Sequence, residues 1–212
     1  TLTILGVSGE TIGLDGITAN TLDSTVSTIC DSSACGLTLT QNELNSITAA
    51  KLVIGDSSSG DIYVDGVNTS HISGGVTFNS SGSGGSVIFG AGGSVLKVAT
   101  INAGNGVTIN GDLSITGSSV FNADYDSSGT GTFTLAATKA LTALTISISA
   151  NDVDILGATS SGTGSTTVAV SDGGTIGLGG TTGDMTISGA ELGNITAGTL
   201  NIGNSSTGNI TV

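Results

Sequence analysis

The chain has 212 residues, 36 of them glycine, with no proline, no tryptophan and a formal net charge of −13. Its only basic side chains are Lys51, Lys97 and Lys139, too few to displace counterions from a phosphate backbone, which excludes nucleic acid and nearly excludes an anionic membrane surface. No apolar run approaches the ~18 residues of a spanning helix, which argues against membrane insertion. Abundant Val, Ile, Leu and Thr, beside turn-forming Gly, Ser and Asn, predict an all-β protein rather than a disordered chain.

Short triplets, in which two apolar residues flank a third residue, recur along the chain. Because side chains alternate across a strand, each triplet predicts a short strand with one dry and one wet face. In chain order the predicted strands are 37–39, 52–54, 62–64, 76–78, 107–109, 113–115, 133–135, 146–148, 153–155, 168–170, 176–178, 185–187, 200–202 and 210–212. Strands this short favour a right-handed parallel β-helix over an antiparallel sandwich, whose strands are longer. With roughly 20 residues per turn and the ~4.8 Å strand spacing, it would be on the order of 50 Å long.

One segment of the chain occurs twice. Residues 37–64 and 185–212 align without a gap at an offset of 148, and 14 of the 28 positions are identical. A shorter echo precedes each copy, TIGLDG at 11–16 and TIGLGG at 175–180. Repeats of this kind stack along one axis, so residues 1–212 are expected to form a single continuous β-solenoid.

The repeat also predicts a core and two open ends. The aliphatic positions of both copies are predicted to be buried: Leu37, Leu39, Ile47, Leu52, Ile54, Ile62 and Val64 in the first, and Met185, Ile187, Ile195, Leu200, Ile202, Ile210 and Val212 in the second. No amphipathic helix is expected to cap either end, and an uncapped strand edge recruits another strand. The chain is therefore expected to continue end to end, covalently or by stacking of identical subunits.

The two cysteines lie in an insertion of the first copy, near 21–36. The interval between echo and repeat is 26 residues in the first copy and 10 in the second, and the extra residues include Cys30 and Cys35. A local disulfide is the first interpretation, and two reduced thiols are the alternative. A metal site would need more ligands than these cysteines and the distant His71. A disulfide would indicate an oxidising, extracellular setting.

Asp124, Asp126 and Ser128, followed by Gly129, are spaced like the first oxygen ligands of a calcium loop. The position at which that loop needs a bidentate Glu holds Leu135. The three residues are therefore a weak Ca²⁺ candidate, and no other cofactor is expected.

Paired carboxylates can hydrolyse glycosides when they face each other across a cleft. The chain offers three pairs: Asp61/Asp65, Asp124/Asp126 and Asp152/Asp154. The chain has no arginine to bind an anionic sugar. His71, which follows the Asn68-Thr69-Ser70 sequon, is interpreted as a surface side chain without a catalytic or metal-binding role. No catalytic residue is assigned, and the protein is predicted not to be an enzyme.

Two further patterns have ordinary explanations. Asn-x-Ser/Thr sequons make Asn68, Asn79, Asn194, Asn204 and Asn209 candidate glycosylation sites, although a chain so rich in Ser and Thr contains about four by chance. Thr-x-Thr occurs at Thr1/Thr3, Thr38/Thr40 and Thr132/Thr134. A flat threonine face can bind ice, and the β-propensity of Thr explains the same motif.

The segments QNELNSITAAKLVIGDSSSGDIYV and GAELGNITAGTLNIGNSSTGNITV resemble repeats of very large surface proteins of the filamentous haemagglutinin type. The resemblance is best over 37–64 and 175–212, and it implies a secreted β-helical fibre shaft without catalytic residues. That family's secretion domain carries an Asn-Pro-Asn-Gly motif, which a chain without proline cannot contain. The expected function is therefore the shaft of an extracellular or cell-surface filament or adhesin, with itself and a carbohydrate or host-surface receptor as partners. The alternatives are a carbohydrate- or ice-binding module and, less favoured, a polysaccharide-active enzyme.

Overall fold

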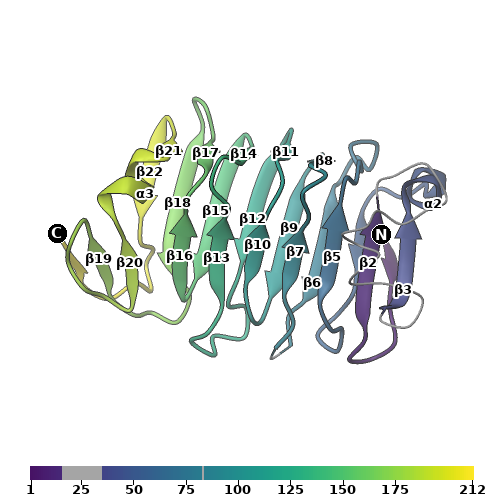
Figure 1. The fold of residues 1–212 in the computed structure, drawn as a ribbon, viewed down its shortest axis with the longest axis horizontal. Helices are drawn as coiled ribbons and strands as arrows, with labels where there is room; N and C mark the ends of the chain where they lie inside the picture. Colours follow the sequence, from purple (N-terminus) through teal and green to yellow (C-terminus); the bar gives the residue numbers. More distant parts are fainter. Residues whose placement is uncertain (16–34, 83) are drawn as a thin grey trace.

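The computed structural model describes residues 1–15, 35–82 and 84–212 as an elongated, nearly all-β molecule (Figure 1). Every strand pairing in these ranges is parallel. The predicted all-β class is confirmed, and the parallel pairing rules out the antiparallel sandwich.

Four sheets hold the described strands. Sheet A contains, in spatial order, β1 (Leu2–Ile4), β4 (Leu52–Ile54), β6 (Val76–Ser80), β9 (Ala99–Ala103), β12 (Ser118–Asn122), β15 (Thr145–Ala150), β18 (Ser165–Val170) and β22 (Thr199–Ile202). Sheet B contains β16 (Asp152–Ile155), β13 (Thr132–Leu135), β10 (Val107–Ile109), β7 (Val87–Phe89), β5 (Ile62–Asp65), β2 (Thr11–Asp15) and β3 (Cys35–Thr40). Sheet C contains β21 (Ile195–Thr196), β17 (Ala158–Ser160), β14 (Ala140–Thr142), β11 (Leu113–Ile115) and β8 (Ser94–Leu96). Sheet D contains β20 (Met185–Ile187), β19 (Ile176–Leu178) and β23 (Ile210–Thr211).

In the middle of the molecule the chain visits sheets A, B and C in turn. We call each such visit a pass; the four complete ones are β6–β7–β8, β9–β10–β11, β12–β13–β14 and β15–β16–β17. Paired residues of adjacent passes in sheet A are 20 to 27 residues apart in the sequence, as with Val76 and Ala99 or Ala99 and Ser119. All the predicted strand triplets lie in strands, apart from Val212, which follows the end of β23.

Aliphatic and aromatic ladders fill the space between the sheets, because the same inward position of successive strands is apolar. One fully buried ladder in sheet A is Ile54, Phe78, Ile101, Phe121, Ile148 and Val168. Two edge-to-face aromatic pairs join sheets A and B, Phe78 with Phe89 at a centroid distance of 6.0 Å and Phe121 with Phe133 at 5.2 Å. Each residue thus packs against its own ladder and against the facing sheet.

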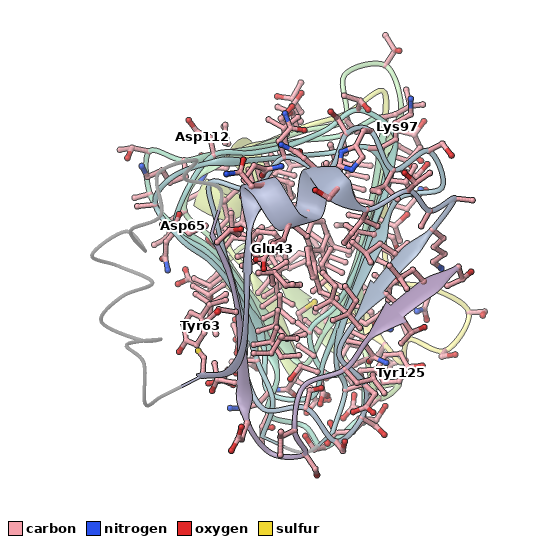
Figure 2. The ribbon with its side chains drawn as sticks, turned by 90° about the vertical axis from the view of Figure 1, so that its right-hand side faces the viewer. Glu43, Tyr63, Asp65, Lys97, Asp112 and Tyr125 are labelled. Carbon is pink, nitrogen blue, oxygen red and sulfur yellow. The ribbon has the colours of Figure 1, made fainter. Side chains whose placement is uncertain are left out.

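Two short helices occupy the same place in the two copies of the repeat, α2 (Gln41–Ser46) and α3 (Gly189–Gly193). Figure 2, which looks onto the N-terminal end, shows α2 lying across that end, and its Leu44 is buried. The expectation that no helix lies at either end was therefore wrong at this one. The physical reason is a capping box at each helix start, Thr40 with Glu43 and Ser188 with Glu191, which satisfies the first free N–H groups.

Candidate functional site

The two copies of the repeat form the same structural unit. We call residues 1–15 and 35–65 unit 1, and residues 165–212 unit 2. In each unit the echo strand lies between the first and last strands of the repeat, in the spatial orders β3–β2–β5 and β20–β19–β23. Likewise β1 pairs with β4 as β18 pairs with β22. The chain therefore builds one strand arrangement twice along the same axis.

Individual hydrogen bonds match as well. Three backbone bonds of unit 1 have counterparts in unit 2: Gly55 N to Ile4 O (2.9 Å) and Gly203 N to Val168 O (2.8 Å), Ile12 N to Asp61 O (2.9 Å) and Ile176 N to Asn209 O (3.0 Å), and Gly60 N to Glu10 O (3.0 Å) and Gly208 N to Gly174 O (2.9 Å). The identical glycines of the repeat, Gly55 and Gly203, both have positive φ angles, +79° and +85°, which glycine adopts without strain. Structural equivalence thus extends beyond the 28 aligned residues, to 1–15 and 165–179 at an offset of 164.

The units differ in which side is covered. Strands β6 and β7 stack on β4 and β5, and Leu52, Ile62 and Val64 are fully buried. Their counterparts in unit 2 are exposed, Leu200 at 38%, Ile210 at 44% and Val212 at 90%. The predicted burial of these three residues is wrong because, in the described part of the chain, β22 and β23 are edge strands.

The opposite sides of the units show the reverse difference. Met185 and Ile187 of unit 2 are buried against the preceding pass, with strand β20 packed beside β16. The equivalent Leu37 and Leu39 of unit 1 are only half-buried. Among residues 1–15, 35–82 and 84–212, each unit therefore has one covered face and one open face, and the open faces lie at opposite ends of the stack.

The junction between unit 2 and the preceding pass is polar as well as apolar. The Thr186 N–H donates to Asp152 Oδ1 (2.9 Å), and the Ile155 N–H donates to Glu191 Oε1 (3.1 Å). The other carboxylate oxygen, Oε2, accepts from the Ser188 N–H (2.8 Å). Strand β21 continues sheet C by pairing Ile195 with Thr159. Glu191 thus both caps its own helix and binds the backbone of the preceding pass.

Unit 1 presents the same residue types at its open N-terminal face. Thr38, Glu43 and Ile47 are identical to Thr186, Glu191 and Ile195 of the junction. Glu43 Oε2 accepts from Thr40 N (2.8 Å) and Thr40 Oγ1 (2.9 Å), and these bonds hold the pKa of Glu43 below its usual value. Sequence reasoning missed the role of this glutamate, although Thr40 and Ser188, each followed three residues later by Glu, are the signature of a helix start.

Asp124, the first residue of the calcium candidate, ties two corners of the fold together. Its Oδ1 accepts from the N–H and hydroxyl of Ser128, and its Oδ2 accepts from Gly129 N (3.2 Å) and Ser171 Oγ (2.6 Å). Burial raises the pKa of Asp124, but the bonds from Ser171, Gly129 and Ser128 outweigh it and leave the pKa lowered. Asp126 is exposed. Residues 1–15, 35–82 and 84–212 contain no group of three His, Cys, Asp or Glu residues placed to hold a metal ion.

Three of the four remaining paired carboxylates also accept backbone N–H groups from the neighbouring part of the stack. Asp61 Oδ1 accepts from Ser86 N (2.8 Å), and the buried Asp65 accepts from Gly92 N through Oδ1 (2.6 Å). Asp152 does the same at the unit 2 junction. The structure thus gives these acidic side chains a local role as links between successive passes, whereas Asp154 is half-buried on β16.

His71 is exposed beside a hollow whose other lining residues are Gln41, Asn45, Gly66, Asn68 and Ser70. The Gln41 side chain spans this region, since its amide nitrogen donates to Asn68 O and its amide oxygen accepts from Asn68 N, both at 2.8 Å. The hollow therefore offers amide, hydroxyl and imidazole groups.

The sequon asparagines lie in different surroundings. Asn68, Asn204 and Asn209 are exposed, whereas Asn79 is half-buried in sheet A. Asn194 Nδ2 donates to Ile155 O (2.8 Å) at the unit 2 junction, so its amide nitrogen is engaged. Cys35 begins β3, while Cys30 lies outside the described residues, so the pairing of the two stays a prediction.

The chain matches no protein-family model, no curated protein and no solved structure. Among the described residues, neither helix has the length and apolar character needed to cross a membrane. The repeated unit and its two faces are therefore the features of the molecule that bear on its function.

Proposed function

We propose that this chain is the non-catalytic shaft of an extracellular or cell-surface filament or adhesin, built as a right-handed parallel β-solenoid. The observation that carries the proposal is the occurrence of the same unit twice, with one strand order along one axis. A unit that repeats along one axis without a change of direction lengthens a solenoid, which is what a filament shaft requires.

The interior supports a mechanical role. Parallel backbone hydrogen bonds link neighbouring strands of the stack, so an axial load is shared among all the sheets. Continuous ladders such as Ile54, Phe78 and Ile101 bury apolar surface at every step. Asp61, Asp65 and Asp152 add charge-assisted bonds between neighbouring strands, which are stronger than neutral ones.

The surface supports an extracellular setting less directly. A net charge of −13 makes shafts repel one another laterally and favours solubility. The resemblance to shaft repeats of filamentous haemagglutinin type suggests a carbohydrate or host-surface receptor as a further partner. The chain itself is the first partner proposed, through end-to-end association.

The alternatives have weaker support. The described residues that line the hollow beside His71 include no Trp, Tyr or Phe ring on which a sugar could stack. The Thr-x-Thr motifs do not form one flat lattice. Thr3 lies in sheet A, whereas the other two motifs lie in sheet B, Thr38/Thr40 on β3 and Thr132/Thr134 on β13. Strands β10, β7, β5 and β2 separate β3 from β13. For a polysaccharide-active enzyme, the carboxylates of Asp61, Asp124 and Asp152 are already engaged by protein donors.

Electron microscopy of the native material tests the proposal. The expected result is long, thin fibres of uniform width whose axial repeat is tens of ångströms, from stacking at ~4.8 Å per pass. Compact particles without a fibrous part would contradict the shaft function. Mass spectrometry of the same material gives the total mass and shows which sequons carry glycans.

A further inference from the structure

The two open faces of the molecule have compositions that match the internal junction. We infer that the N-terminal face of unit 1 binds the C-terminal end of a second copy of this chain, through the same contacts that join unit 2 to the preceding pass. The inference rests on the proposed shaft function and names its partner and contact residues. We call Leu37, Thr38, Leu39, Glu43 and Ile47 the entry face, and Leu200, Asn209, Ile210 and Val212 the exit face.

Exposed apolar side chains concentrate at the ends of the molecule. Ten large apolar residues are exposed in the described chain, and six of them belong to the first or last strands and their turns: Leu2, Leu5, Val7, Leu200, Ile210 and Val212. Apolar surface gathered at two opposite ends, rather than spread along the sides, is the distribution that axial stacking would bury.

The entry face repeats the binding side of the junction. At the junction the Thr186 N–H donates to the Asp152 side chain of β16, and Glu191 accepts the Ile155 N–H of the same strand. Thr38 and Glu43 hold the same positions in unit 1, and Glu43 Oε2 is already oriented by Thr40. The entry face therefore offers a backbone donor, a carboxylate acceptor and the aliphatic side chains of Leu37, Leu39 and Ile47.

The exit face resembles the strand that the junction accepts. At the junction this strand is Asp152-Val153-Asp154-Ile155, with a side-chain oxygen first and aliphatic residues second and fourth. The segment Asn209-Ile210-Thr211-Val212, which contains β23, has the same pattern. By this equivalence the Asn209 side-chain oxygen accepts from Thr38 N–H of the next copy, and Val212 N–H donates to Glu43.

The direction of the strands agrees with this arrangement. Strand β1 is one edge of sheet A and β22 is the other, and the pairs within the sheet are parallel, so β22 of one copy can extend the sheet of the next. The contact is head-to-tail and does not close on itself, so it leads to open filaments. Because each copy carries a charge of −13, added salt will strengthen the association by screening repulsion.

Two substitutions test the faces separately. Thr38→Pro removes the backbone donor on the open edge of β3, where proline is tolerated. Val212→Asp places a charge on a side chain that is 90% exposed, opposite Glu43 of the next copy. Sedimentation velocity over a range of concentrations at high salt is expected to show oligomers of the unmodified chain. For each variant the dissociation constant is expected to rise by roughly tenfold or more. Thermal unfolding should be unchanged in both, whereas the matched control Thr186→Pro should be destabilised.

Mixing the two variants gives the decisive result. Each variant keeps one intact face, so an equimolar mixture is expected to form a one-to-one dimer and nothing longer. A folded, unmodified chain that stays monomeric at every concentration would overturn the inference, and so would a mixture that behaves like the separate variants.

Failure here is distinguishable from failure of the shaft function. Native fibres with a purified chain that stays monomeric would leave the shaft proposal standing and reject the second copy as partner. Compact native particles, together with a purified chain that self-associates through these faces, would reject the shaft function and support the contact between copies.

Discussion

Units 1 and 2 have the same strand order and matching hydrogen bonds, yet equivalent side chains differ in exposure. Val64 is fully buried and its identical counterpart Val212 is 90% exposed. Met185 is buried and its counterpart Leu37 is half-buried. Burial in this fold is therefore decided by the strand stacked above or below, and the local sequence decides only which side chains point inward.

The largest difference is expected between Ile62→Ala and Ile210→Ala. Ile62 is fully buried under β7, so its truncation leaves a cavity and should lower the free energy of unfolding by about 3 kcal/mol. Ile210 is 44% exposed, and the same change should cost less than about 1 kcal/mol. Chemical denaturation of both variants under dilute, monomeric conditions measures the difference. Equal losses would contradict the assignment of β23 as an open edge.

The reverse difference should hold on the other faces. Met185→Ala removes a fully buried side chain between unit 2 and the preceding pass and should cost about 2–3 kcal/mol. Leu37→Ala, at the equivalent position of unit 1, should cost clearly less because Leu37 is half-buried. The same denaturation measurement applies, and a larger loss for Leu37→Ala would show that the entry face is covered in solution.

Asp124, in the pass β12–β13–β14, accepts a hydrogen bond from Ser171 in the first turn of unit 2, whereas the residue of unit 1 that corresponds to Ser171 is the exposed Val7. Asp124→Asn replaces one acceptor oxygen with a donor facing other donors and should lower stability by about 2 kcal/mol, while Asp126→Asn should have little effect. Because the pKa of Asp124 is lowered in the folded state, its contribution is present above the unfolded pKa of ~3.9 and is lost as the pH falls through the folded value. Thermal unfolding between about pH 7 and about pH 2, a range that brackets that pKa, should therefore show a smaller loss of stability on acidification for Asp124→Asn than for the parent.

The smallest effect is expected at the two capping glutamates. Glu191→Ala removes a helix cap and the acceptor of Ile155 N–H, for an expected loss of about 1–2 kcal/mol. Glu43→Ala removes only the local bonds to Thr40 in a dilute monomer and should destabilise less. Parallel thermal melts compare them, and identical losses would mean that the Ile155 contact contributes nothing.

Much of this fold was predictable from local pattern. The strand triplets gave β4, β5, β6, β10, β11, β13 and others because alternation is a property of neighbouring residues. The position of β2 between β3 and β5 was not, since it depends on pairing between strands that are not consecutive in the chain. The exposure of Leu200, Ile210 and Val212 could not be predicted either, because a sequence repeat does not indicate which copy has another strand stacked on it. The Asp124 corner looked like a calcium loop because the same oxygens serve equally well as acceptors of Ser128, Gly129 and Ser171.

Residue-resolved hydrogen exchange on the dilute, monomeric chain tests the central comparison most directly. Amide protection should run in opposite directions in the two units: slow exchange at β5 and faster exchange at β3 in unit 1, but slow exchange at β20 and faster exchange at β23 in unit 2. That pattern would confirm one unit built twice and covered on opposite faces. Equal protection of β5 and β23, or of β3 and β20, would contradict it.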